Sequence, residues 1–551
     1  MHQKYTNLLM MKITFKNIKL VCTALSITVL SISCEQDRAI EELSLQDSET
    51  QKNLSRKQIN DFIFQTTKST NNSFNWTEAP EDVVWSALVL SDYEVMVGYQ
   101  KEGWNEQTTR DYMFESMTAK TRDNQLDEIK NNLLSEVVGM AKNKSASTEN
   151  ILVEEKDELL SMIIKIDNIE TLRNLRASNN IRYIEPMYDP HISSDIQKND
   201  GDLGCAEDNP RYDLRLNYDY INLAPGGKMG WNFRYHKIKE TWEWGGIRDK
   251  GTGKGIGVAI LDTGLSNRQL QLVDTYTGNE YAFNEGYVTG RSISFYDWYG
   301  NNGSSPIDDC GHGTALSGVI ASPRGKYGIH GVAYGANLYN YRANSDVFIY
   351  GATDIAAVSN AFISAANTSN VRIISMSMGA VTRSERIADA IVYAYRKGKL
   401  IFTAAGTTKF GSYVSGQYPN LATIVFPANM TDYDGDVVYG VTGIKTDYSA
   451  CNDCVKGRNV DFAIVMEQKN GTQALSTGLG GLYPTTIGGS SVATATMAGI
   501  AALVWSKDYT RPRAEIIDAL KRTADYPFRT NPIFGYGKPN AYEAYKYPFG
   551  F

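Results

Sequence analysis

The C-terminal three fifths of the chain alternate short apolar runs with longer helix-like segments. Three runs rich in branched residues have strand length: 258–261, 372–376 and 400–404. Three segments around them have helical length: 313–322, 352–367 and 384–397. This alternation is typical of a parallel sheet with helices on both faces. We therefore expect an α/β domain and assign it to residues 231–551.

A different pattern occupies residues 79–190. Runs at 83–90 and 93–97 have the composition of strands, and the polar stretch 105–150 has that of helices. A strand-like run, a helical spacing of three residues and a short strand closed by proline then follow: 159–166, Ile169–Leu172–Leu175 and 181–186. These elements predict a small α+β domain.

Two polar segments flank this small domain. Residues 34–78 are rich in Glu, Gln, Ser, Thr and Asn and poor in branched apolar residues, which predicts a flexible tether. Residues 191–230 are rich in Gly, Asp and Asn, which is typical of a linker.

The first residues have the pattern of an export signal. Lysines from Lys12 to Lys19 precede an apolar run at 20–32, which is too short to span a bilayer as a helix. Small residues then precede Cys34, an arrangement that resembles a bacterial lipobox. We predict a signal peptide at 1–33 and a lipid anchor on Cys34, which places the protein at the outer membrane or cell surface. A plain secretory signal and a secreted protein are the alternative.

Length and charge narrow the possible functions. The 551 residues exceed what one hydrophobic core serves, which fits more than one folded domain. The formal net charge of -7 offers no basic surface to a nucleic acid, so we expect no nucleic-acid partner.

Four cysteines remain once the signal and Cys34 are set aside: Cys205, Cys310, Cys451 and Cys454. Export favours disulfides, and four cysteines allow three pairings. The CxxC spacing most simply closes Cys451 on Cys454, which leaves Cys205 to pair with Cys310. Redox and zinc sites also use CxxC, but a single pair is weak support for either.

Three short segments carry candidate catalytic side chains. A buried strand ends in Asp262 and a glycine turn, His312 lies between two glycines, and Ser491 follows a glycine turn that opens a helix of small residues. A serine hydroxyl needs an imidazole base, and the imidazole needs a buried carboxylate to fix its tautomer. At a helix N-terminus, Ser491 also has a free backbone N–H to offer a developing oxyanion.

The segments GVAILDTG, CGHGT and GGSSVATATMAG, in the order Asp, His, Ser, resemble the subtilisin family. The resemblance covers residues 231–547 and implies a doubly wound fold with a seven-stranded parallel sheet. It also implies a serine endopeptidase that hydrolyses protein or peptide substrates through Asp262, His312, Ser491 and an acyl-enzyme.

The domain at 79–190, which ends in Tyr183-Ile184-Glu185-Pro186, resembles the ferredoxin-like inhibitory propeptide of many subtilisins. This resemblance implies that the chain's own propeptide domain is a partner of the catalytic domain, with a processing site within 191–230. A generic small α+β domain is the alternative.

Further matches supply candidate substrate-binding residues. Residues 376–379 resemble the family segment that pairs with an extended substrate, and residues 403–406 resemble a wall of its specificity pocket. The candidates are Ser377, Met378, Gly379, Ala405 and Gly406.

Two positions depart from the family pattern. Thr407 stands where the family has an oxyanion-hole asparagine, so a shorter, rotatable hydroxyl replaces an amide donor. The loop at 322–327, where many members bind calcium, has no carboxylate or amide side chain. We therefore expect no cofactor and identify no metal ligands, while calcium binding at another place stays open.

Thr407 favours a second function, a catalytically weak or inactive, surface-tethered binding protein. The intact set of Asp262, His312 and Ser491 opposes it. A lipase or esterase is disfavoured, because the order of the three residues and their motifs are not those of α/β-hydrolases.

Overall fold

The structure is a computed structural model. It describes residues 53–70, 72–189, 205, 210–224, 226–245, 251–272, 307–324, 328–407, 426–430 and 436–549. For residues 275–277, 280–283 and 291–297 it describes the backbone only. The chain divides after Asn53, and the described helices and strands all belong to the compact unit that begins at Leu54. The predicted signal peptide, Cys34 and residues 191–204, 206–209 and 225 of the predicted linker lie outside the described residues.

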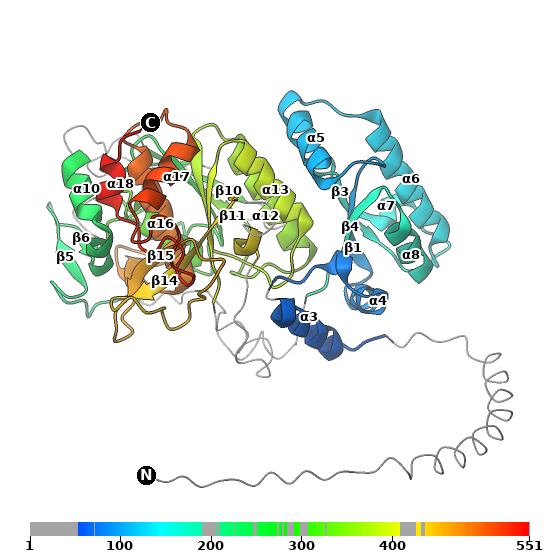
Figure 1. The fold of residues 1–551 in the computed structure, drawn as a ribbon, viewed down its shortest axis with the longest axis horizontal. Helices are drawn as coiled ribbons and strands as arrows, with labels where there is room; N and C mark the ends of the chain where they lie inside the picture. Colours follow the sequence, from blue (N-terminus) through cyan, green and yellow to red (C-terminus); the bar gives the residue numbers. More distant parts are fainter. Residues whose placement is uncertain are drawn as a thin grey trace, which may run out of the picture. The chain divides into compact units, whose positions relative to one another are not determined.

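Within the described residues, a nine-stranded sheet forms the centre of the C-terminal domain (Figure 1). Its strands, in the order β15-β14-β13-β12-β7-β11-β10-β9-β8, are Phe462–Glu467, Tyr439–Lys445, Leu400–Ala404, Val371–Met376, Gly257–Asp262, Asn337–Arg342, Arg291–Asp297, Glu280–Phe283 and Thr275–Thr277. Every neighbouring pair from β15 to β10 is parallel, which confirms the predicted parallel sheet. Strands β9 and β8 add an antiparallel edge that was not predicted.

Helices cover both faces of this sheet. One face carries α10 (Ile238–Gly245), α11 (His312–Ala321), α16 (Gly489–Trp505), α17 (Arg513–Arg522) and α18 (Ala541–Lys546), and the other carries α12 (Gly351–Asn367) and α13 (Glu385–Arg396). In β7, Val258 and Ile260 belong to the hydrophobic cluster of the first face, whereas Ala259 and Leu261 belong to that of the second. Successive strand side chains point to opposite faces. The predicted doubly wound fold is therefore confirmed.

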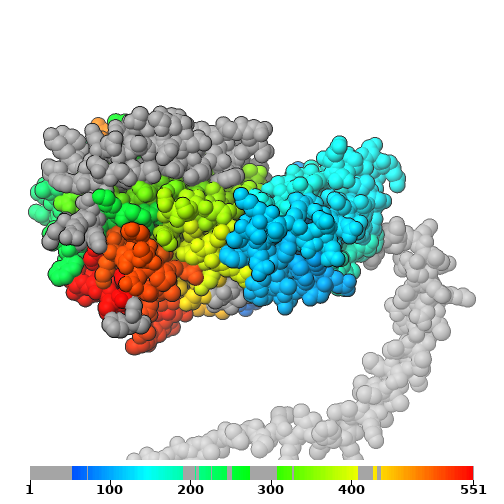
Figure 2. All heavy atoms as spheres, turned by 90° about the horizontal axis from the view of Figure 1, so that it is seen from above, coloured from blue at the N-terminus to red at the C-terminus, as the bar shows by residue number. Residues whose placement is uncertain are grey.

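Helix α16 is the buried centre of the first face. Its residues from Val492 to Trp505 are all buried, as expected for a helix that is apolar or small on every side. A Cβ on Gly499 would lie 2.7 Å from that of Val332, so glycine is required for this close packing. Helix α16 contacts α17 and α18, and α18 contacts α10. On the surface, red and green segments of the chain lie next to each other (Figure 2). Ser491 lies in the first turn of this buried helix.

The N-terminal domain has a four-stranded antiparallel sheet in the order β2-β3-β1-β4. Its elements follow the chain as β1 (Glu94–Tyr99), α5 (Glu106–Ala119), α6 (Asn124–Met140), α7 (Thr148–Ile151), β2 (Leu152–Lys156), β3 (Ser161–Lys165), α8 (Ile169–Ala177) and β4 (Ile181–Pro186). Strand, helices, two strands, helix and strand in this order form a ferredoxin-like fold. The predicted α+β class of this domain holds.

The strand predicted at 83–90 is wrong: the structure has a helix there, α4 (Glu81–Leu90). Pro80 precedes it, Glu81 and Asp82 occupy its first turn, and residues 83–88 are buried on every side. An apolar run of this length has the same pattern in a buried strand and in a buried helix, so periodicity alone cannot separate them.

The flexible tether predicted at 34–78 is also wrong for its last part. Helix α3 (Arg56–Thr70) buries Ile59, Ile63, Phe64 and Thr67, and a short 3-10 helix, η1 (Trp76–Glu78), follows. The buried residues of α3 recur at helical spacing, a stripe that the polar composition of the segment concealed. Within the described residues, the folded N-terminal part therefore begins near Leu54 rather than at residue 79.

Candidate active site

Asp262 ends the buried central strand β7. Every residue of β7 is buried, and the side chain of Asp262 is 0% exposed. Its residues before Asp262 are small or apolar, as expected for a strand that is buried on both faces. Two residues after Asp262, Gly264 has a φ of +110°, which turns the chain away from the strand. Asp262 therefore stands at the carboxyl end of a parallel sheet, the edge at which α/β proteins gather their sites.

His312 is the first residue of α11 and faces Asp262. Gly311, with a φ of +86°, turns the chain into the helix, and His312 Nδ1 lies 2.7 Å from Asp262 Oδ1. Burial lowers the pKa of the imidazole, but the negative charge of Asp262 and this hydrogen bond outweigh it, so the pKa of His312 is raised above 6.5. The pair leaves Nε2 as the ring nitrogen that can exchange a proton with another group.

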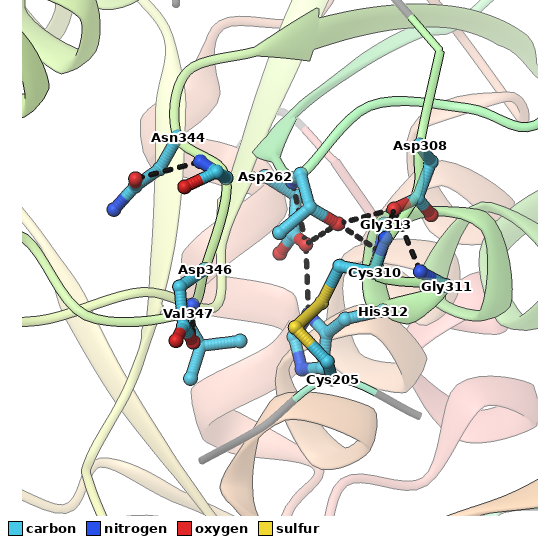
Figure 3. The surroundings of a disulfide bond; sticks show 12 residues. Cys205, Asp262, Asp308, Cys310, Gly311, His312, Gly313, Asn344, Asp346 and Val347 are labelled. Carbon is cyan, nitrogen blue, oxygen red and sulfur yellow. Dashed lines mark hydrogen bonds and ion pairs between the residues drawn. A yellow bond between two sulfur atoms is a disulfide. The ribbon is translucent and has the colours of Figure 1, made fainter. Parts of the chain in front are cut away.

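Asp308 belongs to this site although it was not predicted. Its carboxylate accepts hydrogen bonds from Thr263 Oγ1 (2.9 Å) and from the N–H groups of Cys310 (3.0 Å) and Gly311 (2.7 Å) (Figure 3). It also accepts from the N–H (2.8 Å) and Oγ1 (2.7 Å) of Thr314. It thus joins the loop after β7 to the first turn of α11. The sequence signal was an aspartate shortly before a helix that begins with histidine.

We expect Asp308→Asn to move the acid limb of the pH–rate profile to lower pH. If His312 acts as a general base, it must be neutral, so activity would fall as the pH drops through its raised pKa. The charge of Asp308 contributes to that rise, and the amide removes it. The measurement is kcat/KM against pH. Thr263→Val is the control, because it removes the hydroxyl that bonds to Asp308, Asp262 and Gly313 but changes no charge. An unmoved midpoint in Asp308→Asn would contradict the prediction.

Ser491 lies in the first turn of α16, after a turn in which Gly489 has a φ of +78°. Helix α16 packs against α11, and Ser377 Oγ donates to the carbonyl of Ser491 (3.2 Å). The neighbouring Ser490 Oγ donates to the carbonyl of Gly406 (2.9 Å). The segments that carry Ser377, Gly406 and Ser491 thus meet at the first turn of α16.

The predicted substrate-binding segments lie at the carboxyl ends of β12 and β13. Ser377 and Met378 are buried, and Ala405 N–H donates to Val441 O (2.9 Å). Gly379 already uses both backbone groups: its N–H donates to Val347 O (3.1 Å), and its carbonyl accepts from Ile349 N–H (3.0 Å). An extended substrate could pair with Gly379 only after residues 347–349 move away.

Both predicted disulfides are present. Cys205 pairs with Cys310, two residues before His312, and Figure 3 shows the sulfur bridge beside the imidazole. Cys451 pairs with Cys454, and Thr407 lies opposite Cys454 in an isolated antiparallel bridge. The pairings thus follow the spacing argument from the sequence.

Comparison with known protein families matches residues 253–537, just over half of the chain, to the subtilase family. The chain belongs to the subtilase family. Among curated relatives, it is 24% identical to the minor extracellular protease Epr of Bacillus subtilis over 404 residues, 72% of this chain and 52% of Epr. It is 27% identical to thermitase of Thermoactinomyces vulgaris over 316 residues, 56% of this chain and 94% of thermitase.

The fold of this subtilase is shared with a solved structure. Fervidolysin from Fervidobacterium pennivorans, described as a keratinolytic enzyme related to subtilisin, matches with a TM-score of 0.53 and 18% identity over 83% of this chain and 61% of fervidolysin. The chain spans about half the length of Epr. The family match over residues 253–537 therefore establishes the family, and the likeness to fervidolysin shows the fold.

The described part of this subtilase holds no cluster of metal ligands. Among its residues, no three or more His, Cys, Asp or Glu side chains come together as a metal site. None of the helices that the structure describes is long and apolar enough to cross a membrane.

Proposed function

We propose that this chain is a serine endopeptidase in which Ser491 is the nucleophile, His312 the general base and Asp262 the residue that orients His312. The observation that carries the proposal is the 2.7 Å contact between the buried Asp262 and His312. It fixes the tautomer with Nδ1 protonated and leaves Nε2 to accept a proton. Membership of the subtilase family supports the assignment of Ser491.

The reaction proceeds in two halves. His312 takes the proton of Ser491 as Oγ attacks the peptide carbonyl, and Asp262 stabilises the imidazolium that forms. The backbone N–H of Ser491, in the first turn of α16, and the side chain of Thr407 donate to the oxyanion. His312 then gives its proton to the leaving amine, and water, activated by the same imidazole, hydrolyses the acyl-enzyme.

Labelling with a fluorophosphonate tests this proposal. The reagent bonds to an activated serine hydroxyl, so mass spectrometry should find it on Ser491, together with cleavage of peptides from a library. A binding protein without turnover is the second candidate, because Gly379 pairs with residues 347–349 and Thr407 replaces the family's asparagine. Absence of both label and cleavage would favour it.

We also propose that the N-terminal domain is an inhibitory propeptide. Its contacts with α12 and α13 support this role. Asp389 of α13, 0% exposed, pairs with Arg110 (2.9 Å) and Arg182 (2.9 Å) of the N-terminal domain, and the buried Arg386 pairs with Glu154 (2.6 Å). A buried charge is strongly destabilising without a partner of opposite charge. The surface of the N-terminal domain is therefore complementary in charge to the surface of α13.

The last strand of the N-terminal domain leads along this interface. Glu185 of β4 accepts from the N–H of Glu385 (2.8 Å) at the start of α13, and burial raises the pKa of its carboxyl to about 8. The segment between α3 and η1 pairs with the chain beyond Gly379: Phe74 N–H donates to Val381 O (3.1 Å), and Arg383 N–H donates to Phe74 O (2.8 Å). These contacts place the N-terminal domain against the chain just beyond Gly379, next to the predicted substrate-binding segment, which supports an inhibitory role.

Wild-type protein should process itself, with a new N-terminus between 191 and 230, while Ser491→Ala stays full length. The Cys205–Cys310 disulfide refines this prediction. A cut after Cys205 leaves the N-terminal domain covalently attached to the catalytic domain, whereas a cut at 191–204 frees it. Gels with and without reductant distinguish the two. An unprocessed yet fully active wild type would contradict the propeptide role.

We propose export to the cell surface through a lipid on Cys34, which supports the same function outside the cytoplasm. Metabolic labelling with a fatty acid should mark the wild type and not Cys34→Ser, which should be released in soluble form. Label that persists in Cys34→Ser, or soluble release of the intact wild type, would contradict the anchor.

A further inference from the structure

The Cys451–Cys454 loop is fixed against strand β14. Cys451 N–H donates to Gly443 O (3.1 Å), Asn452 N–H donates to Glu467 Oε2 (3.1 Å), and Thr442 Oγ1 donates to Val455 O. A Cβ on Gly443 would lie 2.7 Å from Cys454 Sγ, so the sulfur occupies space that only glycine leaves open. The loop is therefore seated at one defined place.

The position of the loop argues against thiol–disulfide exchange with another protein. Cys451 is 5% exposed and Cys454 4%, and both belong to the hydrophobic cluster that contains α16. Exchange requires a thiolate to reach one sulfur atom of the disulfide. A buried disulfide instead restrains the chain around it.

The chain that this disulfide restrains runs beside Gly406 and Thr407. Thr407 lies opposite Cys454 in an antiparallel bridge, and Val455 N–H donates to Gly406 O (3.3 Å). The same carbonyl accepts the hydroxyl of Ser490 (2.9 Å), the residue before Ser491. One peptide group thus connects the disulfide loop with the turn that carries the proposed nucleophile.

We propose that the Cys451–Cys454 disulfide is a positioning element of the oxyanion site. It holds residues 454–455 against Gly406 and Thr407, and so keeps the Thr407 hydroxyl at the place where the oxyanion develops. A donor of this kind works only within a few tenths of an ångström of its required position. The inference rests on the proposed peptidase function and assigns a role to a motif which that function does not otherwise use.

The short threonine side chain makes such a restraint more important. An asparagine amide extends further from the backbone and can rotate to compensate for a shift of its strand. Thr407 has its hydroxyl on Cβ, so a displacement of the backbone moves the donor by the same amount. The contacts of Cys454 and Val455 restrict the backbone at Gly406 and Thr407, and so restrict displacement of the Thr407 hydroxyl.

The test is a double-mutant cycle on purified, processed protein. Cys451→Ser with Cys454→Ser should lower kcat by about tenfold and change KM by less than about twofold. The loss is smaller than the roughly 10²- to 10³-fold cost of removing one oxyanion donor, because the hydroxyl is displaced and not removed. Thr407→Val should then cost clearly less in this background than in the wild type, because the hydroxyl is already misplaced. Asn452→Ala, which keeps the disulfide, is the matched control and should retain kcat.

Each outcome decides something different. An inactive wild type refutes the peptidase proposal. An active wild type whose kcat is unchanged by the cysteine substitutions, or in which their effect and that of Thr407→Val simply multiply, refutes the positioning role. Thermal unfolding shows whether the variant with Cys451→Ser and Cys454→Ser folds. If it does not, Cys451→Ala with Cys454→Val keeps both buried positions apolar. The same two results, an unchanged kcat or effects that multiply with that of Thr407→Val, would then refute the positioning role.

Discussion

Ser491→Ala is expected to abolish peptide hydrolysis. The hydroxyl forms the bond to the substrate carbonyl, and His312 has nothing to activate without it. In subtilisin, loss of the serine or the histidine lowers kcat about 10⁶-fold, and that value, measured on a relative, sets the scale. The measurement is cleavage of a peptide library by wild type and Ser491→Ala side by side.

His312→Ala should cost as much as Ser491→Ala, and the double variant should be little worse than either. The residues act as a unit, so their effects do not add. Thermal unfolding of each variant checks that the fold persists. Residual turnover in Ser491→Ala comparable to that of the wild type would refute Ser491 as the nucleophile.

Thr407→Val should lower kcat by about one to three decades and leave KM nearly unchanged. Valine keeps the shape of the side chain but removes the hydroxyl, and a donor aimed at the transition state adds little to ground-state binding. Thr407→Asn should raise kcat, because an amide N–H reaches further. Steady-state kinetics of the three proteins on one peptide provide the comparison.

A different result would reassign Thr407. If kcat of Thr407→Val stays within a few-fold of the wild type, Thr407 packs beside the site and another group binds the oxyanion. The roles of Asp262, His312 and Ser491 would survive that result. The role proposed for Thr407 would not.

The approach of the Asp262 and His312 segments to each other could be predicted, because their glycines allow close tertiary contact as well as local turns. A Cβ on Gly313 would lie 2.4 Å from Gly264 O, so the loops of Asp262 and His312 approach each other only with glycine at this position. The glycine motifs therefore predict both the local backbone turn and which segment packs against it. The parallel sheet followed equally from strand and helix periods.

Other features depend on contacts that a local pattern does not contain. The run at 83–90 is buried on every side as helix α4, and burial rather than propensity selects its structure. Asp308 gains its role from five donors on two segments, and Thr407 gains a neighbour in Cys454 from a loop far along the chain. Sequence spacing alone could not bring these together.

Formation of the disulfide between Cys205 and Cys310 depends on the redox conditions of the cellular compartment. Bacterial cytoplasm keeps thiols reduced, so on the proposed export route this bond forms only after translocation. It closes a span of 105 residues, for which the chain-entropy account gives roughly 5 kcal/mol of stabilisation. That contribution arises two residues from His312, and the protein still inside the cell lacks it. Oxidation thus completes the folding of the histidine loop at the destination of the protein.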